Sequence, residues 1–394
     1  MFNEKMHRLG SNRSVIRELF EFGKQLAAKE GADKVYDFSL GNPSVPAPAV
    51  VKESIQKQID LPNSTALHGY SSAQGDPDVR KAIAAHIEKC HNVAVSPDLI
   101  YLTVGAAAAL CITLRALKED GDNFVCFAPF FPEYTVFTEA TGATLRVAEM
   151  KSDCKMNLQA AAKLIDEKTK GVIINSPNNP SGAVYSEEEI KALCVLLGNK
   201  EKEYGHPIFL ISDEPYREIV YDGVFVPYLM NYYDDVVVCY SYSKSLSLPG
   251  ERIGYIAISP KAKQAQELYY AVCGAGRALG YVCAPHLFQR ILLDCVDAPA
   301  DVAAYDKNRK LLYSSLTEIG YQCIKPQGAF YLMMKTPEPD ANAFSDRAKN
   351  YGLLLVPGDT FGAPGFVRIS YCVSYDMIVR SLPAFKALFA IYAK

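Results

Sequence analysis

The sequence predicts an α/β protein, in which a mostly parallel β-sheet lies between helices and a smaller α+β part follows. In the middle of the chain, short apolar stretches rich in β-branched residues alternate with helical patterns. These strands are apolar throughout, which is typical of a sheet that helices cover on both faces. After about residue 285 the helices and strands are grouped as in an α+β domain.

The first strong helical pattern spans residues 76–90. It opens with Asp76 followed by proline, a common helix start, and Val79, Ile83 and Ile87 recur four residues apart. Short apolar strands are expected at 100–104, 124–128, 172–175, 208–212 and 236–240. Helices are expected between several of them, at 106–117 and 186–204. This alternation predicts parallel pairing of most strands.

The C-terminal part is predicted to contain both kinds of element. Helices are expected at 305–319, 342–351 and from 376 onward, and strands at 329–334, 353–356 and 366–371. We therefore expect a large domain of residues 46–285 and a small domain formed by residues 1–45 and 286–394.

Composition narrows the class of protein. Apolar residues make up 49% and charged residues 22% of the 394, which favours a globular chain over a disordered one. The 41 basic and 44 acidic residues are nearly balanced, so a nucleic-acid partner is not expected. No apolar run reaches the length of a membrane span. The eleven cysteines are scattered without metal-ligand spacing, which predicts a cytoplasmic protein with free thiols and no metal site.

Ligands of open parallel sheets bind beyond the carboxyl ends of the strands. The residues that follow the predicted strands are 105–107, 129–131, 175–182, 213–216 and 241–244. Together they offer small residues before a helix, aromatic rings, amides, a carboxylate, hydroxyls and a lysine. This set would suit a flat, phosphorylated aromatic ligand.

The segment at 241–254 resembles the cofactor-attachment segment of class I/II aminotransferases, the fold-type-I enzymes that use pyridoxal 5′-phosphate (PLP). Lys244 and, eight residues later, Arg252 match, as do Ser241 and Gly250. Further motifs follow the family's order at 68–75, 175–182, 213–216, 328–331 and 366–370. The resemblance covers nearly the whole chain. It implies a seven-stranded, mostly parallel sheet in the large domain and a smaller α+β domain.

Three residues are the candidate catalytic groups. A lysine amine forms a Schiff base with an aldehyde cofactor only if its pKa falls, and Lys244 is the candidate. The resemblance implies that Asp213 keeps the PLP ring nitrogen protonated. It also implies that Asn179 and Tyr216 hydrogen-bond the phenolic oxygen of the ring.

A phosphate needs a helix N-terminus with free N–H groups and a nearby cation. Gly105, Ala106 and Ala107 open such a helix. By the same resemblance, Ser241 and Arg252 complete the phosphate site.

The resemblance assigns the remaining contacts. Phe131 would stack on the cofactor ring, and Tyr70 would reach the phosphate of a partner subunit, which implies a homodimer. Arg368 matches the arginine that binds the substrate α-carboxylate, a task that suits its planar fork. Gly41 matches a glycine that lets the backbone approach the substrate, and Asn179 also lies on the substrate side.

These assignments predict a cytoplasmic aminotransferase that moves an amino group between an L-amino acid and a 2-oxo acid. Lys244 would carry the proton as general base and acid, in two half-reactions with ping-pong kinetics. Aspartate and glutamate are candidate donors. However, Ala107 stands where related bacterial aspartate aminotransferases carry a lysine for the distal carboxylate.

Two other functions stay open. A PLP-dependent carbon–sulfur β-lyase would use the same cofactor residues but release ammonia and pyruvate. A regulator with an aminotransferase-like domain would carry an additional DNA-binding domain, for which the N-terminal segment is short.

The glycine-rich stretch at 274–280 departs from the spacing of a dinucleotide loop, so a nicotinamide cofactor is not expected. Within this stretch, Arg277 is either a surface arginine or the partner of a distal substrate carboxylate.

Overall fold

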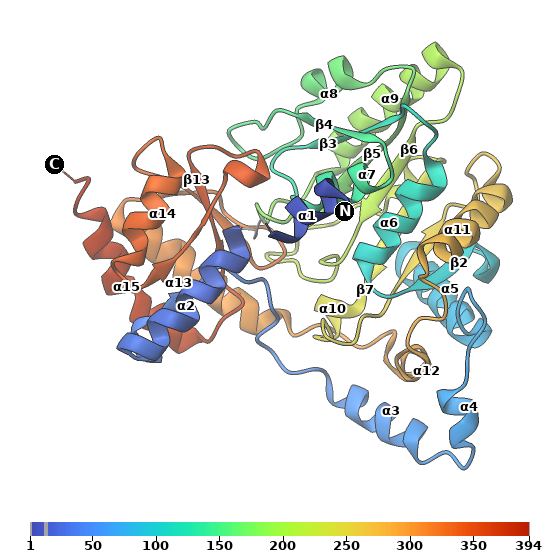
Figure 1. Cartoon of the computed structure of the whole chain (residues 1–394), viewed down its shortest axis with the longest axis horizontal. Coiled ribbons are helices and arrows are strands. Elements are labelled where there is room, and N and C mark those ends of the chain that lie inside the picture. The colour runs from blue at the N-terminus through green and yellow to red at the C-terminus, as the bar shows by residue number, and fades with distance from the viewer. Residues whose placement is uncertain (1, 12–14, 394) are drawn as a thin grey trace.

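The protein folds into a large body built on one sheet and a smaller body beside it (Figure 1). The computed structural model describes residues 2–11 and 15–393. Residues 1, 12–14 and 394 of the expected small domain lie outside these ranges.

The large sheet has seven strands in the order β2-β8-β7-β6-β5-β3-β4. They are β2 (Ile100–Thr103), β3 (Asn123–Phe127), β4 (Thr144–Ala148), β5 (Thr169–Asn175), β6 (Phe209–Asp213), β7 (Val236–Ser241) and β8 (Gly254–Ile258). β8 runs antiparallel to both neighbours, and the pairs from β7 to β4 are parallel. The predicted mostly parallel, seven-stranded sheet is confirmed.

Helices cover this sheet, which explains why its central strands are buried along their whole length. The helices of the large body are α3 (Ala49–Ile59), α4 (Ser64–His68), α5 (Pro77–His91), α6 (Ala106–Leu117), α7 (Glu133–Ala140), α8 (Leu158–Leu164), α9 (Glu187–Tyr204), α10 (Tyr242–Ser245), α11 (Ala265–Leu279) and α12 (His286–Cys295). Asp76 caps α5, and Ser186 with Glu189 forms a capping box on α9. The predicted helix at 106–117 coincides with α6.

The small body contains a four-stranded antiparallel sheet in the order β12-β13-β10-β9. Its strands are β9 (Gln322–Cys323), β10 (Tyr331–Lys335), β12 (Val356–Pro357) and β13 (Phe366–Ser370). Around it lie α2 (Val15–Glu30), α13 (Val302–Ile319), α14 (Ala341–Lys349) and α15 (Tyr375–Phe389). Short 3-10 turns occur at Ala32–Lys34, Pro97–Leu99, Leu229–Asn231 and Asp359–Phe361.

Two strand predictions in the small body were wrong in detail. The single strand expected at 353–356 is divided between two sheets. β11 (Leu353–Leu354) pairs with β1 (Tyr36–Asp37), and β12 pairs with β13. The strand expected from residue 329 begins only at Tyr331. The reason is that the Ala329 N–H donates a hydrogen bond to Ile219 O (2.9 Å), in the chain that follows β6, instead of to a neighbouring strand.

The predicted domain division at 285/286 stays a prediction. α12 packs on α3 and α5, and its residues Ile291, Leu292 and Cys295 belong to the hydrophobic core of the large body. We therefore propose that α12 moves with the large body, so that the division would fall after Cys295.

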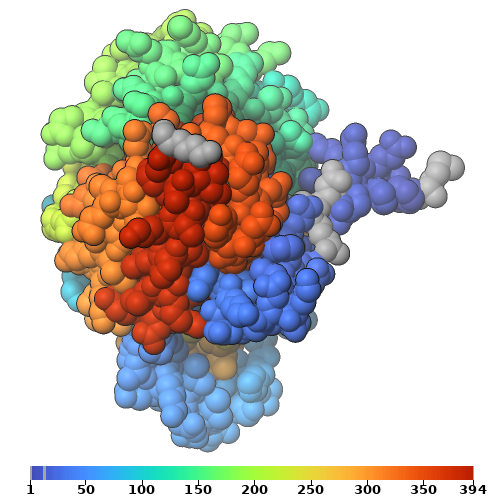
Figure 2. Space-filling view, turned by 90° about the vertical axis from the view of Figure 1, so that its left-hand side faces the viewer, coloured from blue at the N-terminus to red at the C-terminus, as the bar shows by residue number. Residues whose placement is uncertain are grey.

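The N-terminal helix α1 (Glu4–Ser11) projects from the rest of the chain, as the dark blue atoms in Figure 2 show. It buries none of its residues, and Phe2 beside it is 71% exposed. Lys5 pairs with Glu139 of α7 (3.1 Å). Among the described residues, no helix is both long and apolar enough to cross a membrane.

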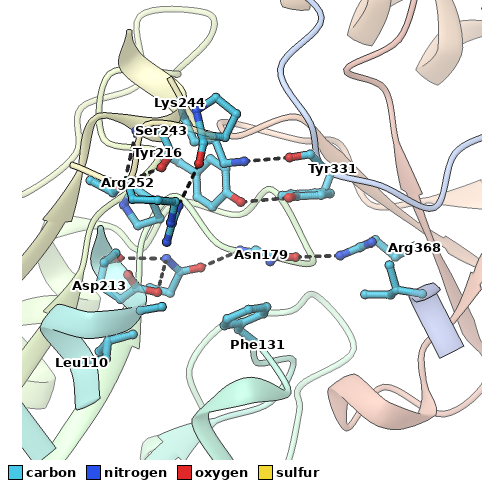
Figure 3. A pocket seen from close by; sticks show the side chains of 18 residues that line it. Leu110, Phe131, Asn179, Asp213, Tyr216, Ser243, Lys244, Arg252, Tyr331 and Arg368 are labelled. Carbon is cyan, nitrogen blue, oxygen red and sulfur yellow. Dashed lines mark hydrogen bonds between the residues drawn. The ribbon is translucent and has the colours of Figure 1, made fainter. Parts of the chain in front are cut away.

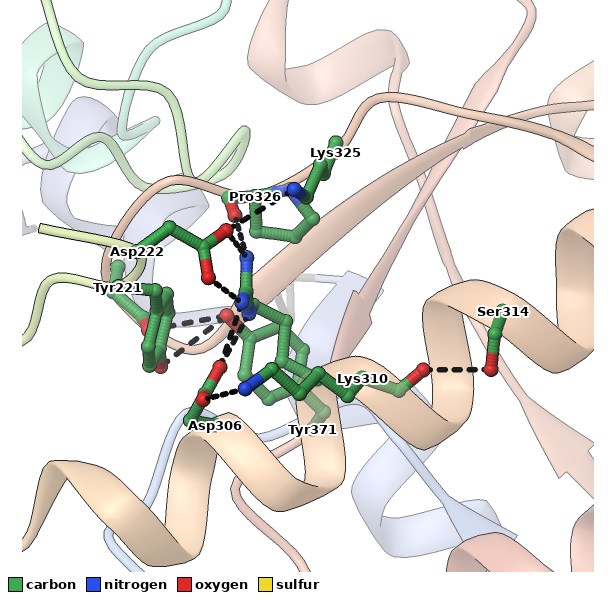
Figure 4. Close-up of polar contacts among 10 residues, drawn as sticks. Tyr221, Asp222, Asp306, Lys310, Ser314, Lys325, Pro326 and Tyr371 are labelled. Carbon is green, nitrogen blue, oxygen red and sulfur yellow. Dashed lines mark hydrogen bonds and ion pairs between the residues drawn. The ribbon is translucent and has the colours of Figure 1, made fainter. Parts of the chain in front are cut away.

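Arg309 on α13 joins the small body to the chain that follows β6. Figure 4 shows its partners Asp222, Asp306 and Pro326 close together. The Arg309 side chain is 2% exposed and donates two hydrogen bonds to Asp222, at 3.0 and 2.8 Å. It also bonds to Asp306 (2.8 Å) and to the carbonyl of Pro326 (2.9 Å), and it lies over the Tyr221 ring. This buried cation therefore links three separate segments of the chain.

Replacing Arg309 should destabilise the fold. Arg309→Ala removes the buried bonds to Asp222 and Asp306, which keep only their exposed lysine partners, and leaves the Pro326 carbonyl without its donor, so the free energy of unfolding should fall by about 2–4 kcal/mol. Lys310→Ala is the control, since Lys310 also pairs with Asp306 but is 65% exposed. It should cost less than about 1 kcal/mol. Urea unfolding measures both values, and equal losses would contradict the role assigned to Arg309.

Candidate active site

A cavity of about 290 Å³ lies at the carboxyl edge of the large sheet, where the two bodies meet (Figure 3). The sheet side of the lining comes from the ends of β5, β6 and β7 and from the start of α6. Tyr331 and Arg368 line it from the small body, and Ile16 and Gly41 from the N-terminal segment. Residues that are distant in sequence thus surround one space.

Lys244 reaches this cavity from the one-turn helix α10, which follows β7 directly. Ser241 caps that turn by accepting a hydrogen bond from the Ser243 N–H (3.1 Å). Burial, together with the positive charges of Arg252 and Arg368, lowers the pKa of Lys244 to about 8. Much of the amine is therefore neutral, and hence nucleophilic, at mildly alkaline pH. Its Nζ donates a hydrogen bond to Gly41 O (2.7 Å).

Asp213 ends β6 and is buried. Tyr134 donates its hydroxyl to Oδ2 (2.5 Å), and the Asn175 amide lies 3.4 Å from the same oxygen. Oδ1 has no hydrogen-bond partner among the described residues. Burial raises the pKa of Asp213 to about 7, the neighbouring Glu214 charge adds to this, and the Tyr134 bond opposes it. An acidic group with a free buried oxygen beside the cavity fits a ligand with a protonated ring nitrogen.

The start of α6 and Arg252 form a site suited to an anion. Gly105 precedes the helix with φ of 87°, and the first N–H groups of α6 receive no side-chain cap. A side chain at Gly105 would collide with the Arg252 guanidinium, so glycine allows their close approach. Ala106, Ala107 and Ser241 also line the cavity here. The fit to a phosphate rests on these N–H groups, the cation and the hydroxyl.

Two phenols meet opposite Lys244. The hydroxyls of Tyr216 and Tyr331 lie 2.8 Å apart, and burial holds the pKa of both above the usual value, to about 12 for Tyr331. Both rings therefore stay protonated and can donate hydrogen bonds. A side chain at Gly41 would collide with the Tyr331 hydroxyl, so glycine is required there.

Arg368 on β13 presents a buried guanidinium to the same cavity. Its Nη1 donates to Asn179 Oδ1 (3.2 Å), its Nη2 to the carbonyl of Ser39, and its Nε has no partner among the described residues. The Tyr331 ring lies 4.8 Å from the guanidinium. Because its Nε–H has no partner among the described residues, this buried guanidinium can still donate a hydrogen bond to a carboxylate ligand.

Phe131 lies below the centre of the cavity in Figure 3, between Asp213 and Arg368. Its ring packs edge-on against Tyr134, with centroids 5.7 Å apart. The predicted stacking on a cofactor ring stays a prediction.

Three predicted residues lie outside the cavity lining, and one of them, Gly105, stands directly before the lining residues of α6. Tyr70 is 98% exposed, and Arg277 is exposed on α11. The glycine-rich stretch at 274–280 is no loop: it forms the end of α11, which stops at Gly280.

The sequence reasoning did not assign several lining or supporting residues. They are Tyr134, Tyr331, Asn175, Ser243, Leu110, Pro215, Pro249 and Ile16. Asn175 could have been found, because it ends β5 directly beside Asp213 in the parallel register. Tyr134 gives a weaker signal, since it follows Phe131 by three residues at a helix start.

The comparisons with known proteins agree with this geometry. A profile of the family described as aminotransferase class I and II matches residues 33–382. The chain is 30% identical to the aspartate aminotransferase of Thermotoga maritima over 360 residues, which cover 90% of this chain and 91% of the relative. It is also 30% identical to the probable aspartate/prephenate aminotransferase of Aquifex aeolicus, with 92% of each chain covered.

Solved structures give the same result. An aminotransferase from Eubacterium rectale is 55% identical and superposes with a TM-score of 0.98 over 100% of both chains. The Thermotoga maritima aspartate aminotransferase superposes with a TM-score of 0.85 at 28% identity, over 96% of this chain and 98% of that one. Since the family profile and these relatives span nearly the whole sequence, the chain belongs to the class I and II aminotransferases and is a transaminase.

Proposed function

We propose that this transaminase binds PLP on Lys244 and moves an amino group between an L-amino acid and a 2-oxo acid. One observation carries the proposal: a buried amine of lowered pKa and a buried carboxyl with a free oxygen line the same cavity. When bound, PLP withdraws electrons from the substrate α-carbon and stores the amino group between two half-reactions.

The residues of the chain divide the remaining tasks. Lys244 Nζ would take the proton from the substrate α-carbon and deliver it to the cofactor carbon that carries the amino group, and would move a proton the opposite way in the second half-reaction; a pKa of about 8 is suitable for both. Asp213 supplies the negative charge that favours a protonated ring nitrogen. Tyr216 donates a hydrogen bond to the phenolic oxygen of the cofactor ring. Arg368 grips the α-carboxylate with its planar fork, and Asn179 holds the guanidinium in place.

The phosphate of the cofactor would lie against the start of α6, between Arg252 and Ser241. Phe131 would cover one face of the ring. This arrangement uses the free N–H groups of the helix and a cation that glycine at position 105 lets approach.

The amino donor is proposed from the relatives and the charges in the cavity. Several relatives are named aspartate or aspartate/prephenate aminotransferases, so aspartate and glutamate are the first donors to test. Among the described residues that line the cavity, the cations are Lys244, Arg252 and Arg368. Each already has a task, so a distal carboxylate needs another cation, and Arg277 of a second subunit is the candidate.

We also propose a cytoplasmic homodimer. The exposed Tyr70 and the projecting helix α1 with Phe2 beside it carry apolar surface suited to a partner subunit. All eleven cysteines are free, which suits a reducing compartment.

The attachment residue can be tested directly. Apoprotein mixed with PLP and then reduced with borohydride should carry the pyridoxyl group on Lys244 in peptide mass maps, and Lys244→Arg should stay unlabelled there. The lowered pKa means that the amine becomes neutral, and reacts, as pH rises through about 8. The initial rate of attachment should therefore be half-maximal near that pH. Label on another lysine would contradict the assignment.

Substitutions of Arg368 and Arg277 should reveal which residue binds which carboxylate of the substrate. Arg368→Ala removes the partner of the α-carboxylate. The transition-state stabilisation that kcat/KM measures should therefore fall by about 2–5 kcal/mol for every amino donor, with PLP still bound. Arg277→Ala should cause such a loss for aspartate and glutamate while leaving alanine nearly unchanged. A panel of donors with 2-oxoglutarate measures both. An equal loss for all donors at Arg277 would remove it from substrate recognition.

Subunit exchange tests the homodimer. Lys244→Ala and Tyr70→Phe chains should each be inactive or weak alone. Mixed dimers should regain activity, because one of their two sites contains both native residues. Sedimentation measures the assembly, and a fully active monomer would contradict the proposal.

A further inference from the structure

We propose that Tyr134 is a positioning residue: by its hydrogen bond to Asp213 it fixes which carboxylate oxygen faces the cavity and favours the ionised form of that carboxylate. This inference rests on the proposed function, since it takes Asp213 as the partner of the PLP ring nitrogen. Tyr134 does not line the cavity and acts only through Asp213 and Phe131.

The geometry allows one arrangement of the carboxyl group. Tyr134 is 1% exposed, and its hydroxyl lies 2.5 Å from Asp213 Oδ2, a length typical of an O–H···O⁻ bond. Because Oδ2 is occupied, Oδ1 is the oxygen left without a partner among the described residues. The Asn175 amide bonds mainly to the Asp213 backbone carbonyl (2.8 Å) and lies 3.4 Å from Oδ2. Tyr134 is thus the stronger of the two donors to the side chain.

The Tyr134 side chain is itself held firmly. It stands in the first turn of α7, and its N–H donates to Phe131 O (3.0 Å). Its ring meets the Phe131 ring at 87°. Tyr134 therefore positions both Phe131, on which the cofactor ring would stack, and Asp213, which would face the ring nitrogen.

The charged and titratable neighbours of Asp213 make this bond important. Burial and the charge of Glu214 both raise the pKa of Asp213, whereas the Tyr134 bond lowers it. Glu214 is paired with Arg217 and accepts a hydrogen bond from the Ser212 hydroxyl.

The other two titratable neighbours are Tyr216 and Cys239. Burial raises the pKa of each above its usual value, so both stay neutral near pH 7. The Tyr134 hydroxyl is therefore the neighbour that favours ionised Asp213. Without it, the pKa of Asp213 would rise further, and a smaller fraction of Asp213 would be ionised at neutral pH.

The test is the affinity of apoprotein for PLP, titrated by absorbance from pH 6 to 9 in wild type and Tyr134→Phe. Loss of a charge-assisted hydrogen bond should weaken PLP binding about 10- to 100-fold at pH 7. The ratio between the two proteins should shrink toward pH 9, where Asp213 ionises in both. Titration of Lys244 affects both proteins alike and cancels in this ratio.

Tyr228→Phe is the matched control. Tyr228 is also buried, but its hydroxyl has no partner among the described residues and it does not line the cavity. Its removal should leave PLP affinity within about twofold of wild type at every pH. In an Asp213→Asn background, Tyr134→Phe should have no pH-dependent effect, because the group it acts on no longer ionises.

The outcomes separate the two proposals. If wild-type apoprotein does not bind PLP, the proposed function fails. If wild type binds PLP but Tyr134→Phe binds equally well, the positioning role is overturned. A loss of the same size at every pH also overturns it, because a packing defect does not depend on the charge of Asp213.

Discussion

Burying ionisable groups around one cavity is the constraint on which the rest of this structure depends. Lys244, Asp213 and Arg368 are all removed from water, which penalises their charged forms. The scaffold offsets this cost with short polar contacts from Tyr134, Asn179 and backbone carbonyls. The same burial lowers the pKa of the lysine to about 8 and raises the pKa of the aspartate to about 7. A lysine pKa near 8 suits a group that takes up and releases a proton near neutral pH.

The parallel sheet is what brings these groups together. β5, β6 and β7 end at the same edge, so Asn175, Asp213 and Ser241 are neighbours without any long loop. This part of the site could be predicted from the sequence, because each residue directly follows an apolar strand. The family resemblance then added Arg368, which lies in the separate small sheet and which no local pattern connects to Asp213.

Other features could not be predicted from sequence, for physical reasons. The division of residues 353–357 between two sheets depends on where β1 and β13 lie in space, and the segment itself is apolar throughout. The bond between Tyr134 and Asp213 is a tertiary contact, and an isolated tyrosine on a short helix is more often an ordinary core residue. The tasks proposed for Tyr70 and Arg277 would depend on a second subunit, and contacts between subunits leave no local pattern in the sequence of one chain.

The segment from Ser39 to Gly41 bonds to two of the buried cations through its own carbonyl oxygens: Ser39 O accepts from Arg368 and Gly41 O from Lys244. A covalent bond at Lys244 Nζ removes hydrogens from that nitrogen and so competes with the Gly41 carbonyl. A ligand attached at Nζ would therefore replace the hydrogen bond to Gly41 O. The net free energy of binding would be smaller than the new contacts alone suggest. The same acceptor stabilises the free lysine, because Gly41 O can accept from Nζ when no ligand is attached to it. The three residues of this segment thus connect the cavity to strand β1, from which only Phe38 separates them.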